Sequence, residues 1–258
     1  MVVVRVHIDV QGSGPDLVLI HGWAMHGGVF APLVERLAPR FRVHRVDLPG
    51  HGYSRDDDTF DLATCAAQIA TATPPALWVG WSLGGLVALR AAIDQSASVR
   101  GMALLASSPC FVNTPDWPHG VDADVFTAFA ANLDAHYREA IERFLALETM
   151  GSPNAQSELR ELKREVFARG EPGLSALTAG LDALEHTDLR ADLPALAMPS
   201  LWIAGRRDRL VPPAAMQWAA EHAPRGRYLE INSGHAPFVS HADEVADALA
   251  RFAAERTP

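Results

Sequence analysis

The sequence predicts an α/β protein with a mostly parallel sheet and one all-helical insertion. Three observations lead to this prediction. Over the first 110 residues, short apolar runs typical of doubly buried strands alternate with helix-like segments. Between residues 111 and 186 only helical patterns occur, and from 187 onward the alternation resumes. We therefore expect a core formed by residues 1–110 and 187–258, flanked by helices, and a helical lid at 111–186.

The elements of the core are expected in a regular order. Strands are predicted where β-branched and apolar residues gather, at 2–10, 17–20, 42–46, 76–79, 101–105, 200–204 and 227–231. Helices are predicted where apolar residues recur at helical spacing, at 29–37, 61–72, 83–93, 213–222 and 243–254. Prolines and glycines separate four further helices in the lid, at 121–133, 136–147, 156–168 and 174–184. An insertion of this size is expected to cover the site that the core builds.

Composition excludes several classes of protein. The 258 residues are 48% hydrophobic and 21% charged, which is typical of a globular chain. A net charge of −9 argues against nucleic-acid binding, which needs a concentrated basic patch. Two cysteines, Cys65 and Cys110, do not form a disulfide framework, and no apolar run is long enough to span a membrane. The N-terminus does not resemble a signal peptide, so we expect a cytoplasmic protein. We also expect the protein to be a monomer.

A candidate nucleophile lies in the motif Gly-Trp-Ser-Leu-Gly at residues 80–84. The motif follows the strand predicted at 76–79 and precedes the helix predicted at 83–93. A serine in this context lies on a sharp strand-to-helix turn that exposes its hydroxyl above the sheet edge. The glycines on either side leave room where the backbone reverses. We therefore interpret Ser82 as a nucleophile, which requires a base and an orienting carboxylate.

Two loops later in the chain hold the expected acid and base. Asp208 follows the strand predicted at 200–204, and His235 follows the strand predicted at 227–231. Both would lie at the carboxyl ends of parallel strands, where open α/β sheets bind ligands. The order serine, acid, histidine is the one expected for a nucleophile on this architecture. The alternatives, which do not directly follow a strand, are His222, His241, Asp188 and Asp192.

The negative charge that develops on a substrate carbonyl needs two preorganised backbone N–H donors. We expect one from Leu83, directly after the nucleophile, and the other from Trp23, in the loop after an early strand. The indole of Trp23 is also expected to form a wall of the acyl pocket. We interpret His21 as a structural histidine and Asp47 as an acid that holds its own glycine-rich loop. No metal-binding or dinucleotide-binding motif occurs, so neither a metal nor a cofactor is expected.

Several motifs together resemble the α/β-hydrolase superfamily across the whole chain: HGW at 21–23, DLPGHGYS at 47–54, GWSLGG at 80–85, GRRD at 205–208 and SGH at 233–235. More narrowly, the segments 80–88, 106–111, 142–151, 180–182, 187–190 and 235–241 resemble the pimeloyl-acyl-carrier-protein methyl ester esterases of biotin synthesis. The resemblance implies an α/β-hydrolase fold. It also implies a substrate that is the methyl ester of a C7 acyl chain on a phosphopantetheine arm.

Carried over position by position, the resemblance places the nucleophile on Ser82, the acid on Asp208, the base on His235 and the oxyanion donors on Trp23 and Leu83. It implies that the substrate contacts Trp23, Ser82, Leu83, His235 and a lid segment formed by Phe144, Leu145, Ala146, Leu147 and Glu148. Glu148 departs from the pattern of that family, in which a glutamine is expected. A carboxylate beside an acyl channel costs more to desolvate.

The resemblance also implies an acidic acyl carrier protein as a partner, docked on basic residues of the lid. The candidate docking residues are Arg143, Arg160, Lys163 and Arg164. The last three share one face of the helix predicted at 156–168. Acidic residues outnumber basic ones in the lid as a whole, so docking would depend on this local patch.

The expected function is that of a serine carboxylesterase, which frees the pimeloyl carboxylate for biotin synthesis. The residues alone leave alternatives open. The same triad serves broader short-to-medium-chain carboxylesterases, thioesterases and C–C bond hydrolases. Some proteins of the superfamily bind ligands without catalysis, although an intact triad and turn argue against that alternative.

Overall fold

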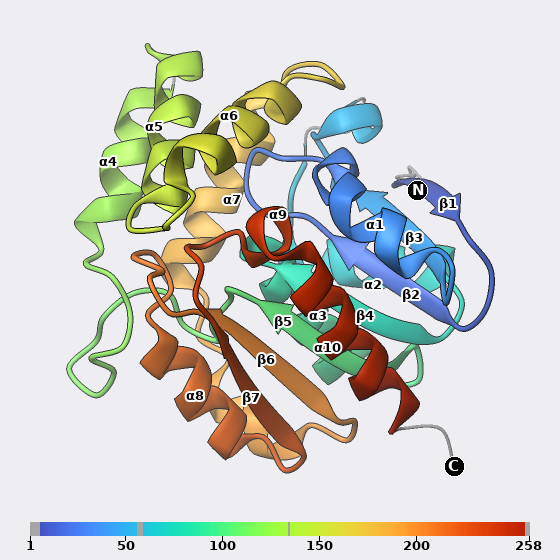
Figure 1. The fold of residues 1–258 in the computed structure, drawn as a ribbon. Coiled ribbons are helices and arrows are strands. Elements are labelled where there is room, and N and C mark those ends of the chain that lie inside the picture. Colours follow the sequence, from blue (N-terminus) through green and yellow to red (C-terminus); the bar gives the residue numbers. More distant parts are fainter. Residues whose placement is uncertain (1–5, 56–58, 134, 256–258) are drawn as a thin grey trace.

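The computed structural model describes residues 6–55, 59–133 and 135–255, and these residues form one seven-stranded sheet (Figure 1). The strand order is β1-β3-β2-β4-β5-β6-β7, with β1 antiparallel to β3 and all other neighbours parallel. The strands are β1 (His7–Gln11), β2 (Asp16–Ile20), β3 (Arg42–Asp47), β4 (Ala76–Trp81), β5 (Val99–Leu105), β6 (Ser200–Gly205) and β7 (Gly226–Ile231). The predicted mostly parallel sheet is confirmed.

Helices lie on both faces of the sheet, which explains the continuous apolar runs of its central strands (Figure 1). Every residue of β4 and β6 is buried, whereas the edge strands β1 and β7 are partly exposed. The flanking helices are α1 (Ala31–Leu37), α2 (Leu62–Ala72), α3 (Leu83–Asp94), α8 (Pro213–His222) and α10 (Ala242–Ala254). Helix α1 packs against α10, α2 against α3, and α8 against β6 and β7.

Four helices lie between β5 and β6 in the chain and gather at the upper left of Figure 1. They are α4 (Asp124–Leu133), α5 (Tyr137–Thr149), α6 (Ala155–Val166) and α7 (Leu174–His186). Helix α4 packs against α5 and α7, and α5 packs against α6. The group is fastened to the core through α7, which contacts α3, and through α6, which contacts the turn η1 (Gly27–Phe30). These four helices are called the lid below.

The elements differ from the sequence prediction mainly at their ends. Helix α4 begins three residues later than predicted because Val121 forms a bridge with Val112 instead of a helical turn. The helix predicted from residue 29 begins as the turn η1 and becomes α-helical at Ala31. Three short elements were not predicted, namely η2 (Gly52–Ser54), η3 (Arg190–Ala195) and α9 (Pro237–Ser240). Residues 2–5 of the first predicted strand lie outside the described residues.

Among the residues that the structure describes, no helix combines the length and apolar character needed to cross a bilayer.

Candidate active site

Ser82 lies on a sharp turn between the end of β4 and the start of α3. Its backbone has φ 52° and ψ −120°, a strained conformation for a residue with a side chain. The turn fits only because its neighbours are glycines. A Cβ on Gly80 would lie 2.2 Å from the carbonyl oxygen of Gly84, and a Cβ on Gly84 would lie 2.3 Å from that of Ile20. The turn is braced by Ser107, whose hydroxyl donates a 2.8 Å hydrogen bond to the carbonyl of Ser82.

His235 and Asp208 meet at the carboxyl ends of β7 and β6. The Nδ1 of His235 lies 2.7 Å from Oδ2 of Asp208, and neither side chain is exposed to solvent. The other carboxylate oxygen of Asp208 accepts hydrogen bonds from the backbone N–H groups of Leu210 (2.8 Å) and Val211 (2.9 Å). These bonds fix the carboxylate in the orientation that receives the imidazole. The structure thus brings together the histidine and the acid expected from the sequence.

Two contacts that the sequence analysis missed hold the His235 loop. The indole Nε1 of Trp81 donates a 2.8 Å hydrogen bond to the carbonyl of His235, and the backbone N–H of His235 donates to the carbonyl of Glu148 at 3.1 Å. Burial opposes a charged imidazolium, but the charge and hydrogen bond of Asp208 outweigh it, so the pKa of His235 lies above its ordinary value.

The two atoms that are expected to react are shielded from solvent. The Oγ of Ser82 and the Nε2 of His235 are both buried, and neither makes a hydrogen bond to the described residues. Ser82, Leu83 and His235 are each 0% exposed.

Leu83 and Trp23 both approach helix α7, where a Cβ on Gly180 would lie 2.9 Å from Cδ1 of Trp23 and 3.2 Å from Cδ2 of Leu83. Leu83 is the first residue of α3, so its N–H has no acceptor within the helix, and the helix N-terminus favours negative charge beside it. Trp23 follows β2, and its indole Nε1 donates to the carbonyl of Leu177 in α7 at 2.8 Å. Its ring also lies against that of Phe144, with centroids 4.6 Å apart. The indole thus joins the core to the lid.

The profile of the alpha/beta hydrolase family matches residues 17–248, from β2 into α10. The chain belongs to the alpha/beta hydrolase family. The pimeloyl-acyl-carrier-protein methyl ester esterase of Xanthomonas oryzae pv. oryzae is 59% identical over 250 residues, which cover 96% of this chain and 98% of that protein. The protein of the same name from Stenotrophomonas maltophilia is 57% identical over 254 residues, which cover 98% of both chains.

Among solved structures, an esterase from Exiguobacterium antarcticum shares this alpha/beta hydrolase fold. Its TM-score is 0.86 at 21% identity, over 96% of this chain and 94% of that chain.

The lid segment expected to contact the substrate is only partly turned toward the site of this alpha/beta hydrolase. Phe144, Leu145 and Glu148 are buried, and Leu147 is half-buried. Ala146 is exposed, so the structure does not bring it into the site. The difference follows from helical geometry, because five consecutive residues of a helix cannot all face the same side.

His21 and Asp47 have structural contacts in this hydrolase. The Nε2 of His21 accepts a 2.9 Å hydrogen bond from the backbone N–H of Leu48, and burial holds the pKa of His21 well below its usual value. Asp47 accepts from the backbone N–H of Tyr53 at 2.9 Å, as expected for an acid that holds its own loop. It also pairs at 3.0 Å with Arg169, which follows α6, a link between core and lid that the sequence analysis missed.

The candidate docking residues are exposed, but three of the four are paired with neighbouring carboxylates. Arg143 lies 2.6 Å from Glu139 and Lys163 lies 2.5 Å from Glu142. Arg164 pairs with Glu161. Arg160 makes no ion pair with any residue in the described part of the chain.

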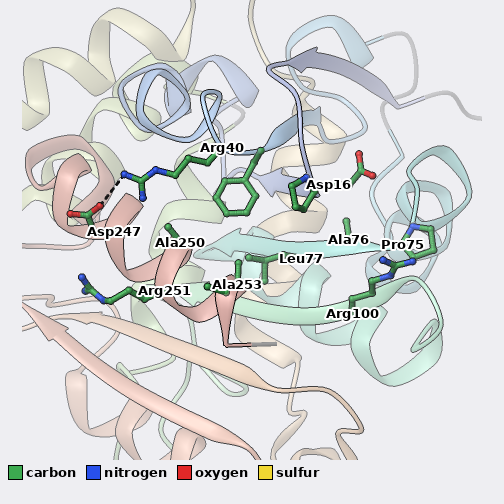
Figure 2. Close-up of a pocket in the computed structure, with 13 residues that line it drawn as sticks. Asp16, Arg40, Pro75, Ala76, Leu77, Arg100, Asp247, Ala250, Arg251 and Ala253 are labelled. Atoms are coloured by element: carbon green, nitrogen blue, oxygen red, sulfur yellow. Dashed lines mark ion pairs between the residues drawn. The ribbon is translucent and has the colours of Figure 1, made fainter. Parts of the chain in front are cut away.

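A cleft of about 830 Å³ opens at the opposite edge of the sheet (Figure 2). It is lined by residues at the amino ends of the strands, among them Asp16 and Ala76, and by Arg40, which pairs with Asp247 at 3.6 Å. Since β4 separates Ala76 from Ser82, this cleft is not part of the candidate active site.

Proposed function

We propose that this chain is a serine esterase that hydrolyses the methyl ester of a pimeloyl chain attached to an acyl carrier protein, acting as a cytoplasmic monomer. The observation that carries the proposal is the 59% identity, across nearly the whole chain, to a protein named for that activity. The strained strand-to-helix turn at Ser82 and the hydrogen-bonded pair of His235 and Asp208 support it. An esterase of this class needs neither a metal nor an organic cofactor for the chemistry described next.

The mechanism follows from the geometry. His235, held by Asp208 with its proton on Nδ1, accepts the Ser82 proton on Nε2 as the serine oxygen attacks the ester carbonyl. The N–H groups of Leu83 and Trp23 stabilise the oxyanion. Methanol leaves with the proton from His235, and an acyl-enzyme ester remains on Ser82. Water, deprotonated by His235, then attacks this ester, releases the carboxylic acid and restores the serine.

The buried residues that are expected to contact the substrate support an apolar acyl chain. Trp23, Phe144 and Leu145 are buried and contribute aromatic and aliphatic surface. A chain of methylene groups gains about 0.8 kcal/mol for each CH₂ that leaves water for such surroundings.

Methanol and thiol release distinguish this esterase from a thioesterase with the same triad. The substrate is the methyl ester of pimeloyl-pantetheine thioester. The proposal predicts one methanol for each molecule consumed and no free thiol. Release of free thiol without methanol would instead establish a thioesterase and contradict the proposal.

The pH dependence of ester turnover tests the base. His235 must be neutral to accept the serine proton, so kcat/KM is expected to fall about tenfold per pH unit on the acid side. Because Asp208 raises the pKa of His235, the midpoint of this fall should lie above pH 6.5. Rates measured from pH 5 to 8 check this prediction. A midpoint near pH 4 would identify a carboxylate as the base.

Charge reversal at Arg160 tests the docking surface that we propose on α6. Arg160→Glu is expected to lower kcat/KM for the carrier-linked ester about fivefold to tenfold at low salt, and less at high salt, because exposed charges act mainly on the association rate. The matched control is Arg100→Glu, which makes the same change at an exposed position on the opposite edge (Figure 2). Hydrolysis of a small free ester should be unchanged in both variants. An equal loss with Arg100→Glu would contradict docking on α6.

A further inference from the structure

Glu148 is a buried carboxyl group for which the proposed mechanism has no use. It lies in the last turn of α5, is 1% exposed, and neither carboxyl oxygen makes a hydrogen bond to the described residues. Burial raises its pKa to about 8. Unpaired buried carboxyl groups are costly, and such groups gather at functional sites.

The position of Glu148 ties it to the candidate base. Its backbone carbonyl accepts the hydrogen bond from the N–H of His235, so the last turn of α5 rests on the loop that carries the histidine. The charges that act on its carboxyl are those of His235, which favours ionisation, and of Asp208, which opposes it. In turn, Asp208 and Glu148 are the two charges that raise the pKa of His235.

Other charged groups near Glu148 are placed differently. Glu158 of α6 is also buried, and its Oε2 makes no hydrogen bond to the described residues. Its Oε1, however, accepts a 2.7 Å hydrogen bond from the hydroxyl of Ser152, and Glu158 is not among the charges that act on His235. Arg207 and Arg209 line an exposed cleft with Gly151, just beyond α5. The pair of Lys163 with Glu142 lies on the exposed side of the lid.

We propose that Glu148 is a positioning residue for His235, and that its carboxylate, when ionised, strengthens His235 as the catalytic base. This inference rests on the proposed function. In its neutral form the carboxyl adds no charge beside the imidazole. Once ionised, it places a negative charge near the imidazolium that forms as the serine proton is taken up, which stabilises that ion. Loss of the Glu148 proton to solvent, and no other reaction, accompanies the change.

The test is the pH profile of kcat/KM on a small free ester from pH 6 to 10. The wild-type profile is expected to show a second rise centred near pH 8, where Glu148 loses its proton. If ionised Glu148 raised the pKa of His235 by one unit, kcat/KM would increase about threefold across this second rise. Glu148→Gln, which preserves size and remains neutral, should show only the rise that belongs to His235. Glu158→Gln is the matched control, a second buried lid glutamate, and should keep both rises.

A purely structural role for Glu148 would change the rate by the same factor at every pH, so the second rise would persist in Glu148→Gln. That result would overturn the inference, as would the absence of a second rise in the wild type. If Glu148→Gln does not fold, the same pH profile is measured on Glu148→Asp. The shorter acid should move the second rise to another pH, and a rise that does not move would refute the positioning role of Glu148. Failure of the proposed function would give a result different from failure of this inference, because Ser82→Ala would then retain ester turnover.

Discussion

Replacing Ser82 with alanine is expected to lower ester turnover by about four to six orders of magnitude, because the acyl-enzyme is expected to form on the hydroxyl that this change removes. The fold should survive the change. The serine hydroxyl makes no hydrogen bond to the described residues, and alanine carries the same Cβ at the strained φ of 52°. Initial rates on a small ester, with circular dichroism and thermal unfolding of both proteins, measure the two effects separately.

Ser107→Ala is the matched control for this prediction. It removes another buried serine hydroxyl, which braces the same turn through its 2.8 Å hydrogen bond to the carbonyl of Ser82. We expect it to cost about 1 kcal/mol of stability and less than about tenfold in rate. If Ser82→Ala retained turnover within tenfold of the wild type, the nucleophile would lie elsewhere.

Asp208→Asn is expected to lower kcat by about four orders of magnitude through the tautomer of His235. The asparagine oxygen would keep accepting the backbone N–H groups of Leu210 and Val211, since this site offers only donors. Its amide nitrogen would then face Nδ1 of His235 as a donor. The imidazole would then carry its proton on Nε2, so Nε2 could not accept the proton of Ser82.

The control for Asp208→Asn is Asp188→Asn. Asp188 is half-exposed, pairs with Arg190 at 2.6 Å, and is not among the charges that act on His235. Its replacement should leave kcat within about twofold, as is typical for an exposed ion pair. Equal losses in the two variants would refute the assignment of Asp208 as the orienting acid.

The positions of Ser82, Asp208 and His235 could be predicted because they depend on local patterns. Each follows a strand with a recognisable apolar run, and the carboxyl ends of parallel strands meet at one edge. The sequence therefore predicts that their side chains lie at the same edge, and the structure shows contact between those of Asp208 and His235. The helices of the lid were predicted for the same reason, from their apolar spacing and from the prolines and glycines between them.

The contacts that complete the site could not be predicted in this way. The bonds from Trp81 to the carbonyl of His235 and from Trp23 to the carbonyl of Leu177 each join residues 154 positions apart. A backbone carbonyl accepts a hydrogen bond whatever its side chain, so the sequence carries no signal for the acceptor. The environment of Glu148 could not be predicted either. Its departure from the expected glutamine is visible in the sequence, but the burial of its carboxyl group without a hydrogen-bond partner depends on how the lid packs.

The intact mass of an acyl carrier protein that bears the pimeloyl methyl ester, before and after incubation with this chain, tests the central claim most directly. Hydrolysis of the methyl ester replaces a methyl group with hydrogen, so the carrier should lose the mass of one CH₂ group and keep its acyl chain. The Ser82→Ala protein, incubated in parallel, should leave the mass unchanged. A carrier that keeps its full mass with the wild-type protein, or loses the entire acyl group, would contradict the assignment.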